Sequence, residues 1–301
     1  MSTPIAAPAP AAKGYLLIHF CVLLFGFTPI MGRLITLDTL PLVWWRMLIA
    51  SLALLLLPMT WRGIRKLSRR LFLACCGAGV VLAITWILFY LSVKLTNASV
   101  AAVCLGTAPL FVAISGPVVL RRPWKKSDLT LAAAVIPGIM LVVGGIPQGM
   151  YWGFVIGLLS AATLVAFSGI NKVLASRAHP LSTTSIEMGA GALFTALVIG
   201  LLPDAAHAFA LPAGYNAILL LVFGVVLTAV PVALTLVSLR YISVFAQQMA
   251  VNLEPVYAVL LAIPLLGEQQ QLGPLFYLGV ALIVGTVMAE PVMRWLTGKK
   301  T

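Results

Sequence analysis

One carboxylate lies inside an apolar part of this chain, where a charge needs a reason. Glu254 falls near the middle of the run from Val244 to Leu266. If that run crosses a membrane, the charge costs roughly 2.5 to 3.5 kcal/mol, unless it is protonated, paired or facing water. We therefore expect Glu254 to be a proton or substrate site, or else a structural carboxylate that holds an interhelical hydrogen bond.

Polar side chains accompany Glu254 on the same run. Gln248 and Asn252 are four residues apart, so they share one face of a helix, with Tyr257 roughly aligned. Pro255 removes a backbone donor, which leaves carbonyls one turn earlier to face a cavity. The segment therefore predicts a polar, kinked wall of a substrate site.

Aromatic and polar strips on three other apolar runs are further cavity candidates. These are Trp86 with Tyr90, Phe167 with Asn171, and Thr228 with Thr235. Each strip alone also fits ordinary packing, and the strips converge only if a central cavity exists. Four prolines, Pro109, Pro117, Pro255 and Pro264, are predicted to kink their helices and to absorb a gating motion.

Other ionisable residues inside apolar runs have structural interpretations. Arg46 lies about one turn from the end of its run and is expected to snorkel or to bond exposed carbonyls. Glu187 is expected to pair or snorkel, and His19 to be a satisfied packing residue. No His-Glu-x-x-His pattern, paired cysteine ligands, triad or nucleotide-binding loop is present. We expect no catalytic residue, no metal and no cofactor.

Composition indicates that these segments lie in lipid. The chain is 62% hydrophobic and 9% charged over 301 residues, against roughly 25% charged residues in soluble domains. Ten runs approach the roughly 20 residues that span a bilayer, and their continuous apolarity predicts helices rather than barrel strands. The runs are Gly14 to Thr36, Leu42 to Pro58, Leu71 to Val93, Ala98 to Leu120, Leu129 to Ile146, Met150 to Val173, Thr183 to Leu202, Ala213 to Leu239, Val244 to Leu266 and Leu272 to Trp295.

A pattern in the first half returns 146 positions later. The matching pairs are Ser92 with Ser238, Lys94 with Arg240, and Pro109 with Pro255. A duplication of five spans explains this register, and an odd number of spans turns the second copy upside down. We therefore predict an all-α integral membrane protein of ten transmembrane helices, built as two inverted five-helix repeats over residues 14–146 and 150–295.

The formal charge of +12 is unevenly distributed along the predicted topology. Most basic residues fall on one side of the membrane, including the cluster Arg62, Arg65, Lys66, Arg69 and Arg70. By the positive-inside rule this side is cytoplasmic and holds both termini, with a disordered tail over residues 1–13 and a basic tail over 296–301. The charge therefore indicates topology and contact with the lipid bilayer, and we expect no nucleic-acid partner.

Several motifs, taken in order along the chain, resemble one family. They are Phe25-Gly26 with Arg33, Pro41 with Arg46, Tyr90-Leu91-Ser92-Val93-Lys94 before Asn97-Ala98-Ser99, and Leu253-Glu254-Pro255 before Leu266-Gly267-Glu268. From Gly14 to about Trp295 the chain resembles the drug/metabolite transporter superfamily, and within it the EamA-type ten-helix carriers. It departs from their pattern at Phe25, where Trp is common, and at Leu120-Arg121-Arg122, where many members carry Leu-Gly-Glu.

The resemblance implies a secondary transporter in the cell inner (cytoplasmic) membrane. Its expected substrate is a small polar metabolite, amino acids first and export favoured, carried by alternating access with a proton as candidate coupling ion. Multidrug or other metabolite efflux is the alternative, and a non-transporting receptor or scaffold is a further one. The protein is expected to be a monomer or a homodimer.

Overall fold

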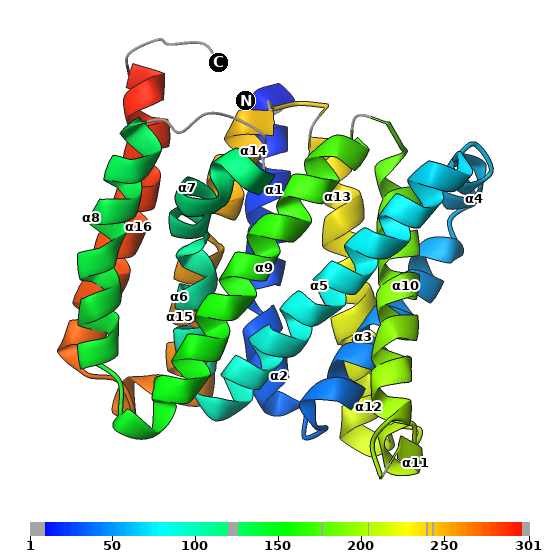
Figure 1. Ribbon diagram of the computed structural model, residues 1–301, viewed down its shortest axis with the longest axis horizontal. Coiled ribbons are helices and arrows are strands. Elements are labelled where there is room, and N and C mark those ends of the chain that lie inside the picture. Colours follow the sequence, from blue (N-terminus) through cyan, green and yellow to red (C-terminus); the bar gives the residue numbers. More distant parts are fainter. Residues whose placement is uncertain are drawn as a thin grey trace, which may run out of the picture.

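The computed structural model describes residues 10–119, 126–175, 177–203, 205–238, 240–242 and 244–296. Within these residues the regular structure is helical and contains no strand, as the apolar runs predict (Figure 1). The helices are α1 (Pro10–Gly26), α2 (Thr28–Leu34), α3 (Thr39–Leu55), α4 (Pro58–Ile64), α5 (Arg69–Leu95), α6 (Ala98–Gly106), α7 (Ala108–Val119), α8 (Lys126–Gly144), the 3-10 turn η1 (Gln148–Met150), α9 (Tyr151–Ala175), α10 (Pro180–Gly200), α11 (Ala205–Ala208), α12 (Gly214–Leu221), the π-helix η2 (Val222–Ala229), α13 (Val230–Ser238), α14 (Val244–Val251), α15 (Glu254–Leu266), the 3-10 turn η3 (Glu268–Gln270) and α16 (Pro274–Leu296).

Each of the ten predicted runs is occupied by helix, but four of them hold more than one helix. By length and composition, five helical stretches of the described residues can cross a membrane, or six if α3 and α4, bent by 92°, are counted as one span. The remaining apolar helices are shorter. The divided runs are α1 with α2, α6 with α7, α12 with η2 and α13, and α14 with α15.

Local signals set several helix ends. Ser68 caps α5 by accepting a hydrogen bond from Leu71 N at 3.3 Å, and Asn97 caps α6 by accepting from Val100 N at 2.9 Å. Gly267 ends α15 with a φ of 66°, which favours glycine. One predicted boundary needs correction, because α1 begins at Pro10 and residues 10–13 are helical rather than part of a tail. Residues 1–9 and 297–301 lie outside the described part of the chain.

The helices pack in a pattern that repeats between the two halves. The contact of α5 with α9 corresponds to that of α13 with α1, and the contact of α10 with α5 to that of η2 with α3. The pairs α3 with α10, α6 with α15, and α8 with α16 join equivalent helices of the two halves. In Figure 1, α1 starts at the upper edge and α9 at the lower edge, so these equivalent helices run in opposite directions.

Small residues allow close approaches between helices. A Cβ added to Gly153 of α9 would lie 2.8 Å from Leu95 Cβ, and one added to Gly157 would lie 2.7 Å from Cys104 Sγ. Both glycines are therefore required where α9 crosses α5 and α6. This close packing places α9 beside the break between α6 and α7.

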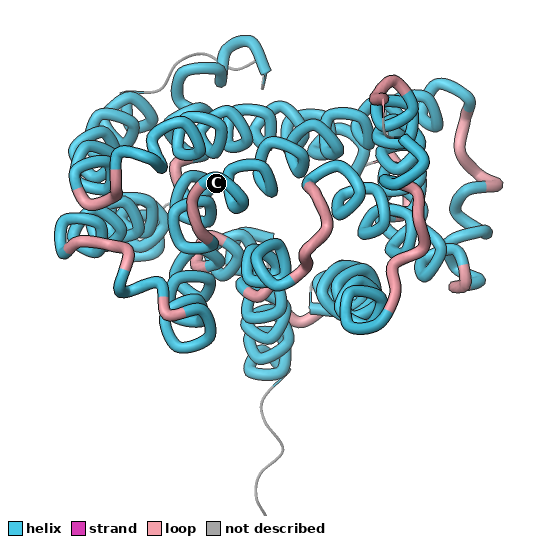
Figure 2. Tube along the Cα trace, turned by 90° about the horizontal axis from the view of Figure 1, so that it is seen from below, coloured by secondary structure: helices cyan, strands magenta, loops and turns pink. Residues whose placement is uncertain are grey.

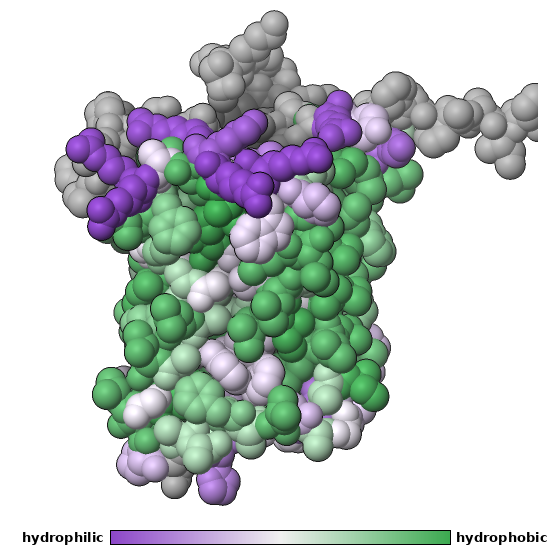
Figure 3. Space-filling model, turned by 90° about the vertical axis from the view of Figure 1, so that its right-hand side faces the viewer, coloured by the Kyte–Doolittle hydropathy of each residue, from purple (hydrophilic) through white to green (hydrophobic). Residues whose placement is uncertain are grey.

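The outer surface is that of a protein surrounded by lipid. Figure 3 shows a broad apolar belt below a hydrophilic band at one end of the molecule. Exposed leucines on the helix flanks, such as Leu193 and Leu197 at 64% each, contribute to this belt. Seen from below, helices dominate and only short loops connect them (Figure 2). The exposed cations Arg62, Arg65, Lys66, Arg69 and Arg70 lie on α4, on the start of α5 and between them.

Candidate functional site

A cavity of about 300 Å³ lies where the two broken helices meet. Its walls come from α6 and α7, from α9, from the segment joining α14 to α15, and from α16. The polar residues that line it include Asn252, Glu254 and Ser168. Its volume is at the lower end of the roughly 300 to 1,000 Å³ of small-molecule sites.

Both helix breaks follow from proline. Pro109 and Pro255 each lie in the first turn of the second helix of their pair, where a missing N–H costs little. The first helix of each pair therefore ends just before the proline, at Gly106 and at Val251. A Cβ added to Gly106 would lie 3.2 Å from Pro255 Cγ, so the two breaks face each other. Interrupted helices at equivalent positions of two repeats commonly form the substrate site of a transporter.

Glu254 is the first residue of α15 and lines the cavity, as its sequence position suggested. It is partly exposed and belongs to the cavity wall. The N-terminus of α15 stabilises negative charge at this point. The charge of Arg46 on α3 also acts on this carboxylate. The cation whose charge acts on the cavity carboxylate therefore lies in the interior of the bundle.

Arg46 lies in the interior, so the prediction that it snorkels is wrong. Its side chain is 4% exposed. Its Nε donates to Thr228 Oγ1 at 3.0 Å and its Nη1 donates to the Tyr90 hydroxyl. Its Cζ lies 3.6 Å from the centre of the Trp86 ring and 4.3 Å from that of Phe223. Hydroxyls and aromatic faces satisfy the guanidinium inside the bundle, and α3 is covered by α5, α10 and η2 on its packed faces.

The π-helix η2 places two residues against Arg46. Thr228 donates its hydroxyl proton to the carbonyl oxygen of Phe223, five residues earlier, at 2.8 Å. This spacing is that of a π-helix, a form that often marks functional sites. Trp86, Tyr90 and Thr228, predicted as separate strips, therefore converge on one cation, which we call the Arg46 cluster together with Phe223.

The other predicted cavity residues lie elsewhere. Asn171 is a polar neighbour of the Glu187 carboxylate, which is buried and does not snorkel, and Glu187 Oε1 has no hydrogen-bond partner among the described residues. The Tyr257 hydroxyl lies 3.1 Å from His19 Nδ1, so His19 is hydrogen-bonded as predicted. Thr235 donates to the carbonyl of Val232 in its own helix at 2.7 Å.

Four further predicted residues do not contribute a described cavity contact. Phe167 packs partly buried between two apolar clusters. The side chain of Gln248 lies outside the described part of the structure. Neither Pro117 nor Pro264 interrupts its helix, because α7 continues to Val119 and α15 to Leu266. The discontinuities are therefore at Pro109 and Pro255.

Glu268 has a structural role that the sequence did not reveal. It is 2% exposed, and its carboxylate accepts hydrogen bonds from the backbone N–H groups of Ala98 and Ser99 at 2.8 and 2.9 Å. Together with Asn97 it caps the start of α6. The motifs Asn97-Ala98-Ser99 and Leu266-Gly267-Glu268 were noted in the sequence, but their pairing was not, because the carboxylate is distant in the chain from the helix that it caps.

Comparisons with known proteins agree with this architecture. The model of the EamA-like transporter family matches residues 12–144 and again residues 149–289. A solved crystal structure, described only as that of a protein, superposes with a TM-score of 0.63 at 16% identity, over 95% of this chain and 99% of the other. At that identity the likeness shows the fold alone. No curated protein sequence matches this chain.

Proposed function

The chain belongs to the EamA-like transporter family, a group of membrane transporters of small molecules. From this premise we propose that it carries a small polar metabolite, amino acids first and export favoured, across the cytoplasmic membrane by alternating access. The observation that supports this most is the cavity at the paired helix breaks, with Glu254 in its wall and the charge of Arg46 acting on that carboxylate.

The chemistry of the two groups favours a zwitterion. An amino acid carries an ammonium, which a carboxylate such as Glu254 attracts, and a carboxylate, which a guanidinium binds through directed N–H groups. Arg46 has five N–H donors, of which Nε and Nη1 hold Thr228 and Tyr90. Arg46 lies in the interior and not among the residues that line the cavity, so it acts on the cavity through its charge rather than by direct contact.

The size and lining of the cavity favour a metabolite over a drug. Its volume of about 300 Å³ suits a small solute, and its walls are mainly aliphatic residues with Asn252, Glu254 and Ser168 as polar points. A multidrug carrier needs a larger, mainly aromatic surface that tolerates loss of the carboxylate. Replacement of Glu254 therefore distinguishes the two functions.

Two features support alternating access. The inverted halves, with proposed boundaries near residues 14–146 and 150–295, have repeating contacts, and such a pair of halves commonly alternates between two packing arrangements. The facing breaks before Pro109 and Pro255 are places where the backbone bends with few helical hydrogen bonds to lose. Glu254, at one of these breaks, is the proposed site of a coupling proton.

The proposed orientation places both termini in the cytoplasm. The described ends of the chain lie at the same edge of the molecule, and the basic residues of α4 and α5 lie at that edge as well (Figure 1, Figure 3). The positive-inside rule assigns such an edge to the cytoplasmic side. The protein then releases its substrate at the opposite edge.

The test is counterflow of labelled amino acids by the full chain in liposomes, with and without a pH gradient. We expect wild type to exchange at least one amino acid, and the gradient to accelerate net flux. Glu254→Gln is expected to lose the gradient dependence, whereas Asn216→Ala, at an exposed residue that binds Thr36, serves as a control. Binding without flux for every amino acid tested would instead indicate a receptor.

A further inference from the structure

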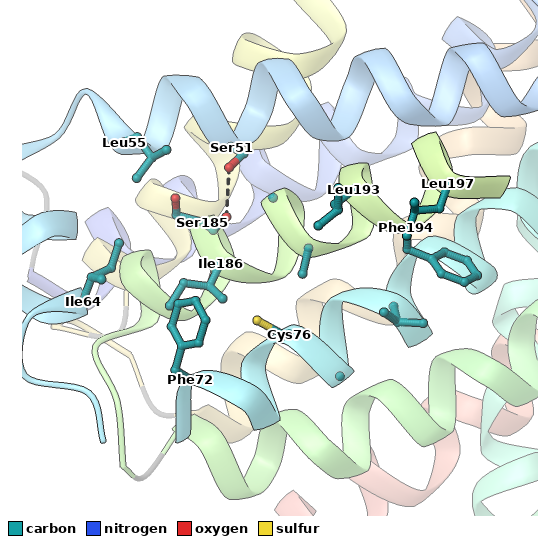
Figure 4. A pocket seen from close by; sticks show the side chains of 14 residues that line it. Ser51, Leu55, Ile64, Phe72, Cys76, Ser185, Ile186, Leu193, Phe194 and Leu197 are labelled. Atoms are coloured by element: carbon teal, nitrogen blue, oxygen red, sulfur yellow. Dashed lines mark hydrogen bonds between the residues drawn. The ribbon is translucent and has the colours of Figure 1, made fainter. Parts of the chain in front are cut away.

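A second hollow of about 590 Å³ lies on the lipid-facing side, away from the cavity of Glu254. It is a groove between α3, α4, α5 and α10, and Figure 4 shows its lining side chains. Phe72, Cys76 and Leu193 are among the residues that line it. The hydroxyl of Ser51 donates to the Ser185 carbonyl at 3.0 Å, so this polar group of the lining is already bonded. The groove suits an apolar chain and offers little to a polar substrate.

The bend between α3 and α4 opens this groove and is firmly held. The two helices meet at 92°, so α4 does not continue along the α5–α10 surface. Thr60 Oγ1 donates to the Leu54 carbonyl at 2.7 Å, and Trp61 Nε1 donates to the Leu55 carbonyl at 2.7 Å. Ser182 Oγ on α10 donates to the Thr60 carbonyl at 2.8 Å. The groove is therefore a built feature of the fold.

The groove has the length of one leaflet. Phe72, Cys76 and Val80 repeat every four residues on α5, which extends the lining over about 12 Å along that helix. On α10 the lining extends from Ser185 to Leu197, or about 18 Å. These lengths bracket half of the roughly 30 Å of hydrocarbon in a bilayer. An acyl chain of one leaflet fits along it.

The end of the groove near α4 is surrounded by positive charge. Ile64 and Phe72 line that end, as Figure 4 shows. The chain between and beside them carries five exposed cations, Arg62, Arg65, Lys66, Arg69 and Arg70. Each Lys or Arg near the surface attracts an anionic headgroup.

We propose that this groove is a binding site for one anionic phospholipid, with an acyl chain between α5 and α10 and the headgroup phosphate on the cations of α4 and α5. The apolar lining binds an acyl chain, and the cations attract a negatively charged headgroup. A zwitterionic lipid therefore binds through its acyl chain alone. The proposal does not depend on the transported substrate, because the groove and the Glu254 cavity share no lining residue.

The chain offers a variant that fills the groove without distorting the fold. A Cβ on Gly77 meets nothing within 4 Å, so Gly77→Leu occupies open groove space, and leucine is a better helix former than glycine. Gly285→Leu is the matched control, because Gly285 lies in α16, is exposed and is equally uncrowded. The headgroup site is tested with the double variant Arg65→Gln/Lys66→Gln. Its control is Lys13→Gln/Arg240→Gln, which also removes two exposed cations, one on α1 and one just after α13.

The experiment is native mass spectrometry of the purified full chain with dioleoylphosphatidylglycerol or dioleoylphosphatidylcholine. We expect wild type to retain one phosphatidylglycerol at least tenfold more strongly than phosphatidylcholine. Gly77→Leu should lose this retention, and Arg65→Gln/Lys66→Gln should reduce it by roughly fivefold per cation, while both controls match wild type. Equal retention of the two lipids by wild type, or unchanged retention by Gly77→Leu, would overturn the proposal.

Discussion

Glu254 and Glu268 are close in the chain, and both are carboxylates in an apolar protein, yet their surroundings differ. Glu268 is buried and accepts two backbone hydrogen bonds at the start of α6. Glu254 is partly exposed to a cavity, and the charge that acts on it comes from Arg46 on another helix. The Glu268 carboxylate has a structural role, because it caps a helix. The Glu254 carboxylate lines a cavity that a solute can occupy. The groups around a carboxylate therefore indicate its role better than the depth at which it is buried.

The largest effect on stability is expected at Glu268. Glu268→Ala leaves the buried N–H groups of Ala98 and Ser99 without their acceptors, which costs about 3 kcal/mol. A clear fall in the thermal unfolding midpoint of the detergent-purified protein is the expected result. Glu268→Gln retains one acceptor oxygen and should lose about half as much. An unchanged midpoint for Glu268→Ala would contradict the structural role.

Replacement of Glu254 should reduce transport and leave stability almost unchanged. Glu254→Gln has nearly the same volume and removes only the charge and its attraction to Arg46. We expect transport per folded molecule to fall at least tenfold while the unfolding midpoint stays near that of wild type. If transport and folded yield fall equally, Glu254 is a structural carboxylate like Glu268.

Arg46→Lys tests the role of the cation that acts on Glu254. Lysine keeps the charge but lacks the planar fork that donates to Thr228 and Tyr90 and stacks on Trp86. We expect roughly tenfold weaker transport, measured as a higher half-saturating substrate concentration in liposomes. Combined with Glu254→Gln, the two losses should not add, because the charge of Arg46 acts on Glu254. Strict additivity of the two free energies would show that the groups act independently.

The smallest effect is expected from single hydrogen bonds within the Arg46 cluster. Thr228→Val removes the hydroxyl that accepts from Arg46 Nε, a loss of about 1 kcal/mol or roughly fivefold in transport. Thr235→Val is the matched control, since its hydroxyl bonds only within its own helix among the contacts we find in the described residues. Equal losses for the two variants would indicate a general effect on the helix rather than on Arg46.

Hydropathy and proline positions predicted the helices and the two breaks well, because lipid imposes helix formation and proline locally removes a donor. Glu254 and Asn252 were identified for the same local reason. Arg46 was misplaced because its depth along a helix does not reveal which face turns inward. The partner of Glu268 and the π-helix at Thr228 depend on contacts between distant segments, which a single sequence does not encode locally.

The central claim is that one cavity opens to both membrane faces in turn. Ser168 lines this cavity and is exposed, so Ser168→Cys, with Cys21, Cys75, Cys76 and Cys104 replaced by alanine, provides a probe. Labelling with a membrane-impermeant thiol reagent is measured in right-side-out and inside-out vesicles of a variant that retains counterflow. The account predicts labelling from both sides. Labelling from one side only, or from neither, would contradict it.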